Sequence, residues 1–139
     1  MIVARNLQDR PVLGAAALAR ISAVVDERLG ASDATVGLAF VADTEMSSLH
    51  ERFMGDPSTT DVLSFPAEQA DYWGDVAVCT DQAQRQALQL RHPYTYELAV
   101  LILHGLLHLR GYDHVVDGGE MTRLEEALRP RCGATGELR

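Results

Sequence analysis

The chain has 139 residues, of which 47% are hydrophobic and 23% charged, as expected for one globular domain over residues 1–139 and not for a disordered chain. Its net charge is −8, and all 12 of its basic residues are arginines. This charge excludes broad, non-specific binding of nucleic acid, which needs a basic surface. It permits a nuclease whose few arginines gather at one groove.

Hydrophobic periodicity and turn residues predict nine elements in the order β, α, β, α, β, β, α, α, α. Strands are expected at residues 2–4, 35–41, 62–65 and 75–79. Helices are expected at residues 12–29, 44–53, 81–90, 93–109 and 120–129. Asp43 is a suitable cap for the helix at 44–53, which Gly55 is expected to end, and Thr80 for the helix at 81–90. Pro66 is expected to end the strand at 62–65 and suits an edge strand. The order predicts an α+β fold, a small sheet with helices packed against it.

The helix expected at 93–109 is apolar on nearly all sides, which is typical of a helix buried at the centre of its domain. Its apolar run over 98–103 is too short to span a membrane. The first residues lack the layout of a secretory signal peptide, and two cysteines form no disulfide framework. We therefore expect a cytoplasmic protein without a membrane partner, and Cys79 is expected to be a small core residue.

Three histidines follow one another at the end of this central helix, in the run His104-Gly-Leu-Leu-His108-Leu-Arg-Gly111-Tyr-Asp-His114. Residues four apart share one helical face, so His104 and His108 can direct their rings at one point. Gly111 can leave the helix in a left-handed conformation, after which His114 can return to the same point. Three imidazoles without a fourth protein ligand are typical of an open zinc site, where the metal lowers the pKa of water to about 7. The pattern favours a hydrolase with one zinc ion per chain.

Gly105 occupies the position where zinc peptidases carry a glutamate that serves as general base. A phosphodiester suits such a site better than a peptide, because a metal can stabilise its leaving alkoxide directly. The absent side chain at Gly105 is expected to permit close approach of another helix or of substrate, or tight core packing. A zinc peptidase and a structural zinc site remain alternatives, although a structural site would normally have four protein ligands.

The histidine run resembles the signature of the YbeY family, bacterial metal-dependent endoribonucleases that process ribosomal RNA. Two further blocks, residues 60–66 and residues 74–79, resemble this family in the same order and spacing. The resemblance implies a mixed four-stranded sheet flanked by helices and zinc held by His104, His108 and His114. It also implies maturation of small-subunit ribosomal RNA, ribosome quality control, and partners in the small subunit or among assembly factors, with RNA and not DNA as substrate. The strand at 62–65 would line the active cleft.

The chain departs from this family at Met54, where much of the family carries an arginine that is important for activity. Arg52 is two residues away and points to another helical face, so the role of that arginine cannot be transferred to it. RNA contacts are instead expected from a few arginines and from polar groups near the cleft strand: Arg52, Arg85, Arg110, Ser64 and Asp61. A ribosome-assembly factor with weak or no catalysis therefore remains the main alternative function. The sequence does not identify the general acid or base.

Overall fold

The structure is a computed structural model that describes residues 1–29, 34–112 and 118–132. Its central element is one mixed sheet with the strand order β1-β2-β4-β3. The strands are β1 (Ile2–Asn6), β2 (Thr35–Val41), β3 (Val62–Gln69) and β4 (Tyr72–Cys79). Strands β1, β2 and β4 are parallel to one another, and β3 runs antiparallel to β4 at the edge of the sheet. The expected mixed four-stranded sheet is confirmed.

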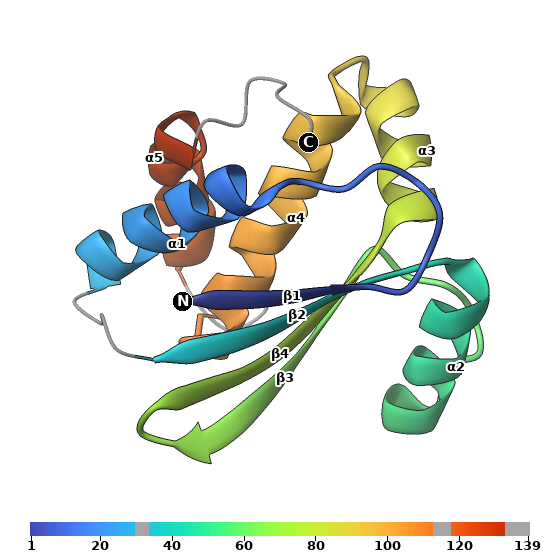
Figure 1. Ribbon diagram of the computed structural model, residues 1–139, viewed down its shortest axis with the longest axis horizontal. Helices are drawn as coiled ribbons and strands as arrows, with labels where there is room; N and C mark the ends of the chain where they lie inside the picture. Colours follow the sequence, from blue (N-terminus) through green and yellow to red (C-terminus); the bar gives the residue numbers. More distant parts are fainter. Residues whose placement is uncertain (30–33, 113–117, 133–139) are drawn as a thin grey trace.

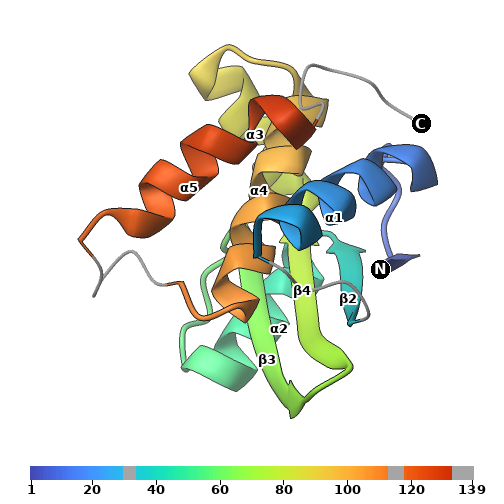
Figure 2. The same cartoon turned by 90° about the vertical axis from the view of Figure 1, so that its left-hand side faces the viewer.

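In the described part of the chain, five α-helices pack around this sheet, as the sequence predicts. They are α1 (Ala15–Leu29), α2 (Asp43–Met54), α3 (Thr80–Leu90), α4 (Tyr94–Leu109) and α5 (Glu120–Leu128), and a short 3-10 turn follows at Pro130–Cys132. Helices α1, α4 and α5 lie on one side of the sheet, with α4 between the other two, and α2 lies at the other side (Figures 1 and 2). No helix within the described ranges is both long enough and apolar enough to cross a membrane.

Side chains that alternate along the strands divide the core between these two sides. In β2, Val36, Leu38 and Phe40 face the main core, which α1, α4 and α5 complete. The residue that follows each of these in β2 belongs to the other face of the sheet. On that face Val41 packs in a smaller cluster with Met46 of α2. The central position expected of the apolar helix is confirmed, because most residues of α4 are buried.

Several predicted boundaries are wrong in instructive ways. Pro66 does not end β3, which continues to Gln69; a proline lacks the N–H that a central strand needs, but β3 is an edge strand. Asp43 and Thr80 are the first residues of their helices and not the caps, which are Ala42 and Cys79. Gly55 ends α2 at a left-handed φ of 72°, as expected.

A candidate metal centre on the central helix

Helix α4 places His104 and His108 one turn apart on the same face, as the spacing predicts. Their Nε2 atoms lie 3.0 Å apart, and their ring centroids are separated by 4.6 Å. Both side chains are partly exposed, although the helix that carries them is largely buried. Gly111 has a φ of 93°, so the chain leaves α4 in the left-handed conformation that the sequence predicts. His114, the third predicted ligand, lies outside the described residues.

A carboxylate from α5 orients the first histidine. Nδ1 of His104 donates to Oε1 of Glu125 at 2.6 Å, and the Glu125 side chain is only 5% exposed. Because an ionised carboxylate can only accept, this bond places the ring hydrogen on Nδ1 and leaves the Nε2 lone pair directed toward His108. Arg129 donates to the other oxygen of Glu125 at 3.1 Å and balances part of its charge.

These donors fit a zinc-like ion. Zinc–nitrogen distances of 2.0–2.1 Å place two ligands of a tetrahedral site about 3.3 Å apart, close to the observed Nε2 separation. A carboxylate behind a ligating imidazole is the usual outer partner in zinc sites, where it fixes the tautomer and raises ligand basicity. The pair His104–His108 with Glu125 is therefore suited to hold such an ion, with a third ligand still to be supplied.

Sequence reasoning did not identify Glu125. It lies on the apolar face of α5, one position after Leu124 and four after Met121, both buried. An acidic residue on a face expected to be buried requires a partner, because an unpaired buried charge is costly. That signal was present in the periodicity of residues 120–129, but the partner is 21 positions away and only the fold shows it.

Gly105 is confirmed as a position of tight packing. A Cβ atom built there would lie 2.6 Å from Cγ1 of Val76 in β4 and 3.3 Å from Cγ2 of Val62 in β3. The hydroxyl of Ser64 in β3 donates to the carbonyl oxygen of Gly105 at 3.0 Å. The helix that carries the histidines is thus held directly against the sheet, and no side chain fits at this position without displacing β4.

The other predicted substrate residues lie in different parts of the molecule. Asp61 lines the same pocket as His104, and its Oδ1 accepts the backbone N–H of Val62 at 2.8 Å. Arg85 on α3 forms two hydrogen bonds to Asp43, at 2.7 and 2.9 Å, and Arg110 places its guanidinium 4.2 Å from the ring centroid of Trp73. The substrate roles of these residues, of Ser64 and of Arg52 stay predictions.

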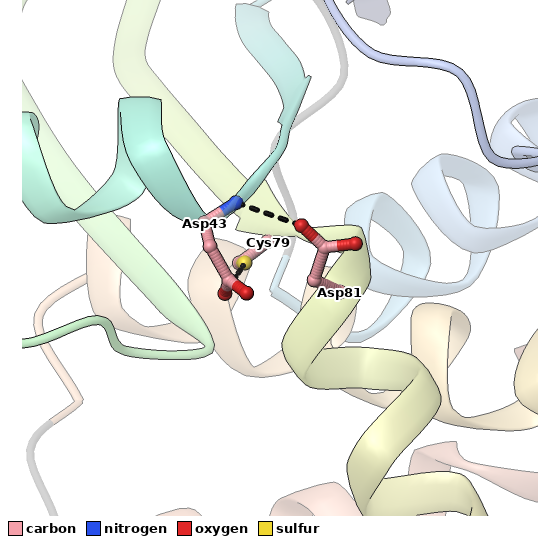
Figure 3. Close-up of side chains that lie close together, drawn as sticks. All are labelled: Asp43, Cys79 and Asp81. Atoms are coloured by element: carbon pink, nitrogen blue, oxygen red, sulfur yellow. Dashed lines mark hydrogen bonds between the residues drawn. The ribbon is translucent and has the colours of Figure 1, made fainter.

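A second group of possible ligands, Asp43, Cys79 and Asp81, lies where β4 passes into α3 (Figure 3). Their ligand atoms lie within 4.8 Å of one another, so their spacing would allow a metal ion. Both carboxylates, however, already face arginines: Arg85 lowers the pKa of Asp43 to about 2, and Arg10 bonds Asp81 at 2.7 Å. Asp81 also accepts the backbone N–H of Asp43, and burial raises the pKa of the Cys79 thiol, which disfavours the thiolate that metals require. This group resembles a structural ion-pair cluster more than a metal centre.

A sequence profile of the family described as Endoribonuclease YbeY matches residues 8–132. The chain belongs to the YbeY family. An Endoribonuclease YbeY of Koribacter versatilis is 44% identical over 103 residues, which cover 74% of this chain and 68% of the relative. Another, of Desulforamulus reducens, is 36% identical, with 95% of this chain and 97% of the relative covered. The solution structure of TM1509 from Thermotoga maritima is similar over 95% of this chain and 89% of its own, with a TM-score of 0.68 and 26% identity.

The end of α2 is where the sequence predicts a departure from the family. Met54 is the last residue of α2 and is 67% exposed, so no packing requirement explains an apolar side chain there. Arg52 lines a groove on the α2 side of the sheet, with its guanidinium 5.7 Å from the ring centroid of Phe53. It does not line the pocket that contains His104.

Proposed function

We propose that this chain is a zinc-dependent endoribonuclease that cleaves single-stranded regions of ribosomal RNA precursors, and that His104, His108 and His114 hold the ion. Membership of the YbeY family supports the reaction class. The observation that carries the metal assignment is the His104–His108 pair, with Nε2 atoms 3.0 Å apart and Glu125 bonded to the outer nitrogen of His104.

The residues around the pair have separate tasks. When bound, zinc supplies Lewis acidity that stabilises negative charge on a phosphodiester and activates water. His104 and His108 provide nitrogen ligands, and Glu125 fixes the tautomer and orientation of His104. Val76 leaves no room for a glutamate at position 105, so this helix lacks the carboxylate base of a zinc peptidase. That absence favours a phosphodiester substrate over a peptide.

The charge of the chain limits how it holds RNA. A net charge of −8 does not provide a broad basic face, so a few arginines near the cleft must neutralise phosphates. Arginine suits this task because its planar guanidinium grips phosphate with two hydrogen bonds. We place the protein in the cytoplasm, where precursors of small-subunit ribosomal RNA and assembly factors are its expected partners.

Met54 supports a second candidate function. Its exposed apolar side chain occupies the position where much of the family has an arginine needed for activity, and Arg52 lies in a different groove. A chain without that arginine could retain the fold and the metal while acting mainly as a ribosome-assembly factor with weak or no catalysis.

One assay distinguishes these functions. Zinc-loaded protein is incubated with single-stranded RNA, fully paired RNA and casein, and the His108→Ala variant is the matched control. We expect cleavage of the single-stranded RNA alone, and none by the variant. RNA binding without cleavage would favour the assembly factor, and cleavage of casein would overturn both proposals.

A further inference from the structure

A pocket of about 380 Å³ lies beside His104, and it extends well beyond the proposed metal site. It extends along the face of α4 away from the metal ligands, with one wall from α5 and one from the segment before β3. Besides His104, its polar and aromatic lining includes Asp61, His92, Tyr96, Glu97, Glu125 and Arg129. Its volume falls within the range of small-molecule sites and accommodates a single nucleotide unit.

The far end of the pocket is a rigid group built on Glu97. The Glu97 side chain is 5% exposed. Its Oε1 is hydrogen-bonded to Nε2 of His92 at 2.6 Å, and its Oε2 accepts a hydrogen bond from the side-chain amide of Gln86 at 2.6 Å. The His92 ring contacts Tyr96 edge to face, with centroids 4.8 Å apart. Both rings are therefore fixed before any ligand arrives, which lowers the entropy cost of binding.

The position of this group excludes a direct part in the reaction. Glu97 precedes His104 by seven residues, which is about two helical turns or 10 Å along the axis of α4. A group that exchanges a proton with the reacting atoms must lie about 3 Å from them. The distance suits contact with a neighbouring nucleotide of the same strand.

The charges of the pocket show which part of a nucleotide it suits. Its carboxylates, Asp61, Glu97 and Glu125, repel a phosphate, whereas Asp61 has lone pairs left to accept from an amino or hydroxyl group. Arg129 brings a positive charge to the same lining, and its guanidinium already donates to Glu125 at 3.1 Å. Tyr96 and His92 provide ring surfaces on which a base can stack.

We infer that this pocket binds the base and ribose of the nucleotide next to the scissile phosphate, with Tyr96 as the stacking residue. The inference rests on the proposed endoribonuclease function, for which it adds a subsite. It explains a preference for single-stranded RNA, since a base that stacks on Tyr96 cannot at the same time be stacked in a duplex.

The test measures binding and cleavage of a short single-stranded RNA in which one abasic nucleotide is moved through the sequence. Binding is followed by fluorescence anisotropy in chelator, and cleavage with zinc. For the natural protein we expect one abasic position, adjacent to the cleavage site, to weaken binding about ten-fold, a typical effect of one base–aromatic stack. Tyr96→Leu should weaken binding of intact RNA equally and lose the sensitivity to that abasic position.

Tyr94→Leu is the matched control, because Tyr94 is on the same helix but bonds Pro11 outside the pocket. It should bind and cleave like the natural protein, and thermal melting verifies that both variants are folded. Equal abasic sensitivity in Tyr96→Leu and in the natural protein would overturn the subsite. Absence of RNA cleavage by the natural protein, with Tyr96-dependent binding retained, would overturn the proposed function and leave the subsite standing.

Discussion

Two histidine–carboxylate pairs along α4 have almost the same local structure but different surroundings. In the His104–Glu125 pair and in the His92–Glu97 pair alike, nitrogen and oxygen lie 2.6 Å apart, the histidine is 24% exposed and the carboxylate 5%. The first pair faces a second imidazole, with His108 Nε2 3.0 Å away. The second faces the ring of Tyr96 and the amide of Gln86.

The difference shows that a buried carboxylate behind a histidine does not by itself make a metal site. The carboxylate fixes the ring in both cases, but only the first ring meets another imidazole nitrogen. We expect metal ligation where the i, i+4 spacing aligns two imidazoles, and a binding surface where the neighbour is aromatic instead.

The largest expected effect separates the two pairs directly. Substituting His108→Ala should abolish zinc binding and RNA cleavage, because it removes one ligand of an open site. His92→Ala, the matched substitution in the other pair, should retain one zinc per chain. Elemental analysis after dialysis measures both. Full zinc occupancy in His108→Ala would place the ion elsewhere, and loss of zinc in His92→Ala would make the two pairs equivalent.

The next largest effect is expected when the carboxylate of each pair is replaced. Glu125→Gln is expected to weaken zinc affinity about 10–100-fold, since loss of an outer partner lowers the basicity and order of its histidine. Glu97→Gln should leave zinc affinity unchanged while loosening His92. Competition with a chromogenic chelator gives both affinities, and an equal loss in the two variants would show that the carboxylates act through general stability.

Gly105 allows a test of the close packing behind the first pair. A helical Gly→Ala change normally stabilises by about 1 kcal/mol, but here we expect a loss of about 1–3 kcal/mol, because the new methyl meets Val76. Gly118→Ala is the control, since its Cβ would meet only a Glu120 oxygen, at 3.8 Å. Urea unfolding measures both variants. Gly105→Glu should not hydrolyse peptides, and measurable peptidase activity would contradict this account of position 105.

The smallest effect concerns a carboxylate paired with arginine and not with histidine. The pKa of Asp43 is lowered to about 2 by Arg85, so the pair stabilises the fold fully above the ordinary value of 3.8 and loses its effect as the pH falls toward 2. Arg85→Ala should therefore cost less than about 1 kcal/mol near neutral pH, since the pair is exposed, and nothing below pH 2. Zinc content should not change, and a second equivalent of zinc in Arg85→Ala would show that the Asp43 cluster binds metal once the arginine is removed.

Much of the fold follows from periodicity, because strand and helix patterns are local properties of the chain. The buried helix, its histidine pair and the left-handed exit at Gly111 are of this kind. The edge position indicated by Pro66 is confirmed, but the pairing with β4 that continues β3 to Gln69 depends on contacts between strands and not on local sequence. Glu125 and the pocket around Tyr96 were missed for a related reason, since both depend on α5 packing against α4.

Arg85 shows a different limit. Its charge and its position before the central helix made it a reasonable candidate for phosphate, but the sequence does not show that Asp43, 42 residues away, occupies its guanidinium. Composition reports how many arginines a chain has, whereas only the fold reports which of them are already neutralised.

Because Gly105 lies against Val76, the helical segment that carries the two histidines is anchored by the apolar core. Zinc fingers, in contrast, are unfolded without their metal. If the proposed site is anchored by the core in this way, zinc would enter and leave it without unfolding the chain. Which divalent ion the protein carries in a cell would then depend on the metals available to a chain that has already folded, and growth conditions would become a determinant of its activity.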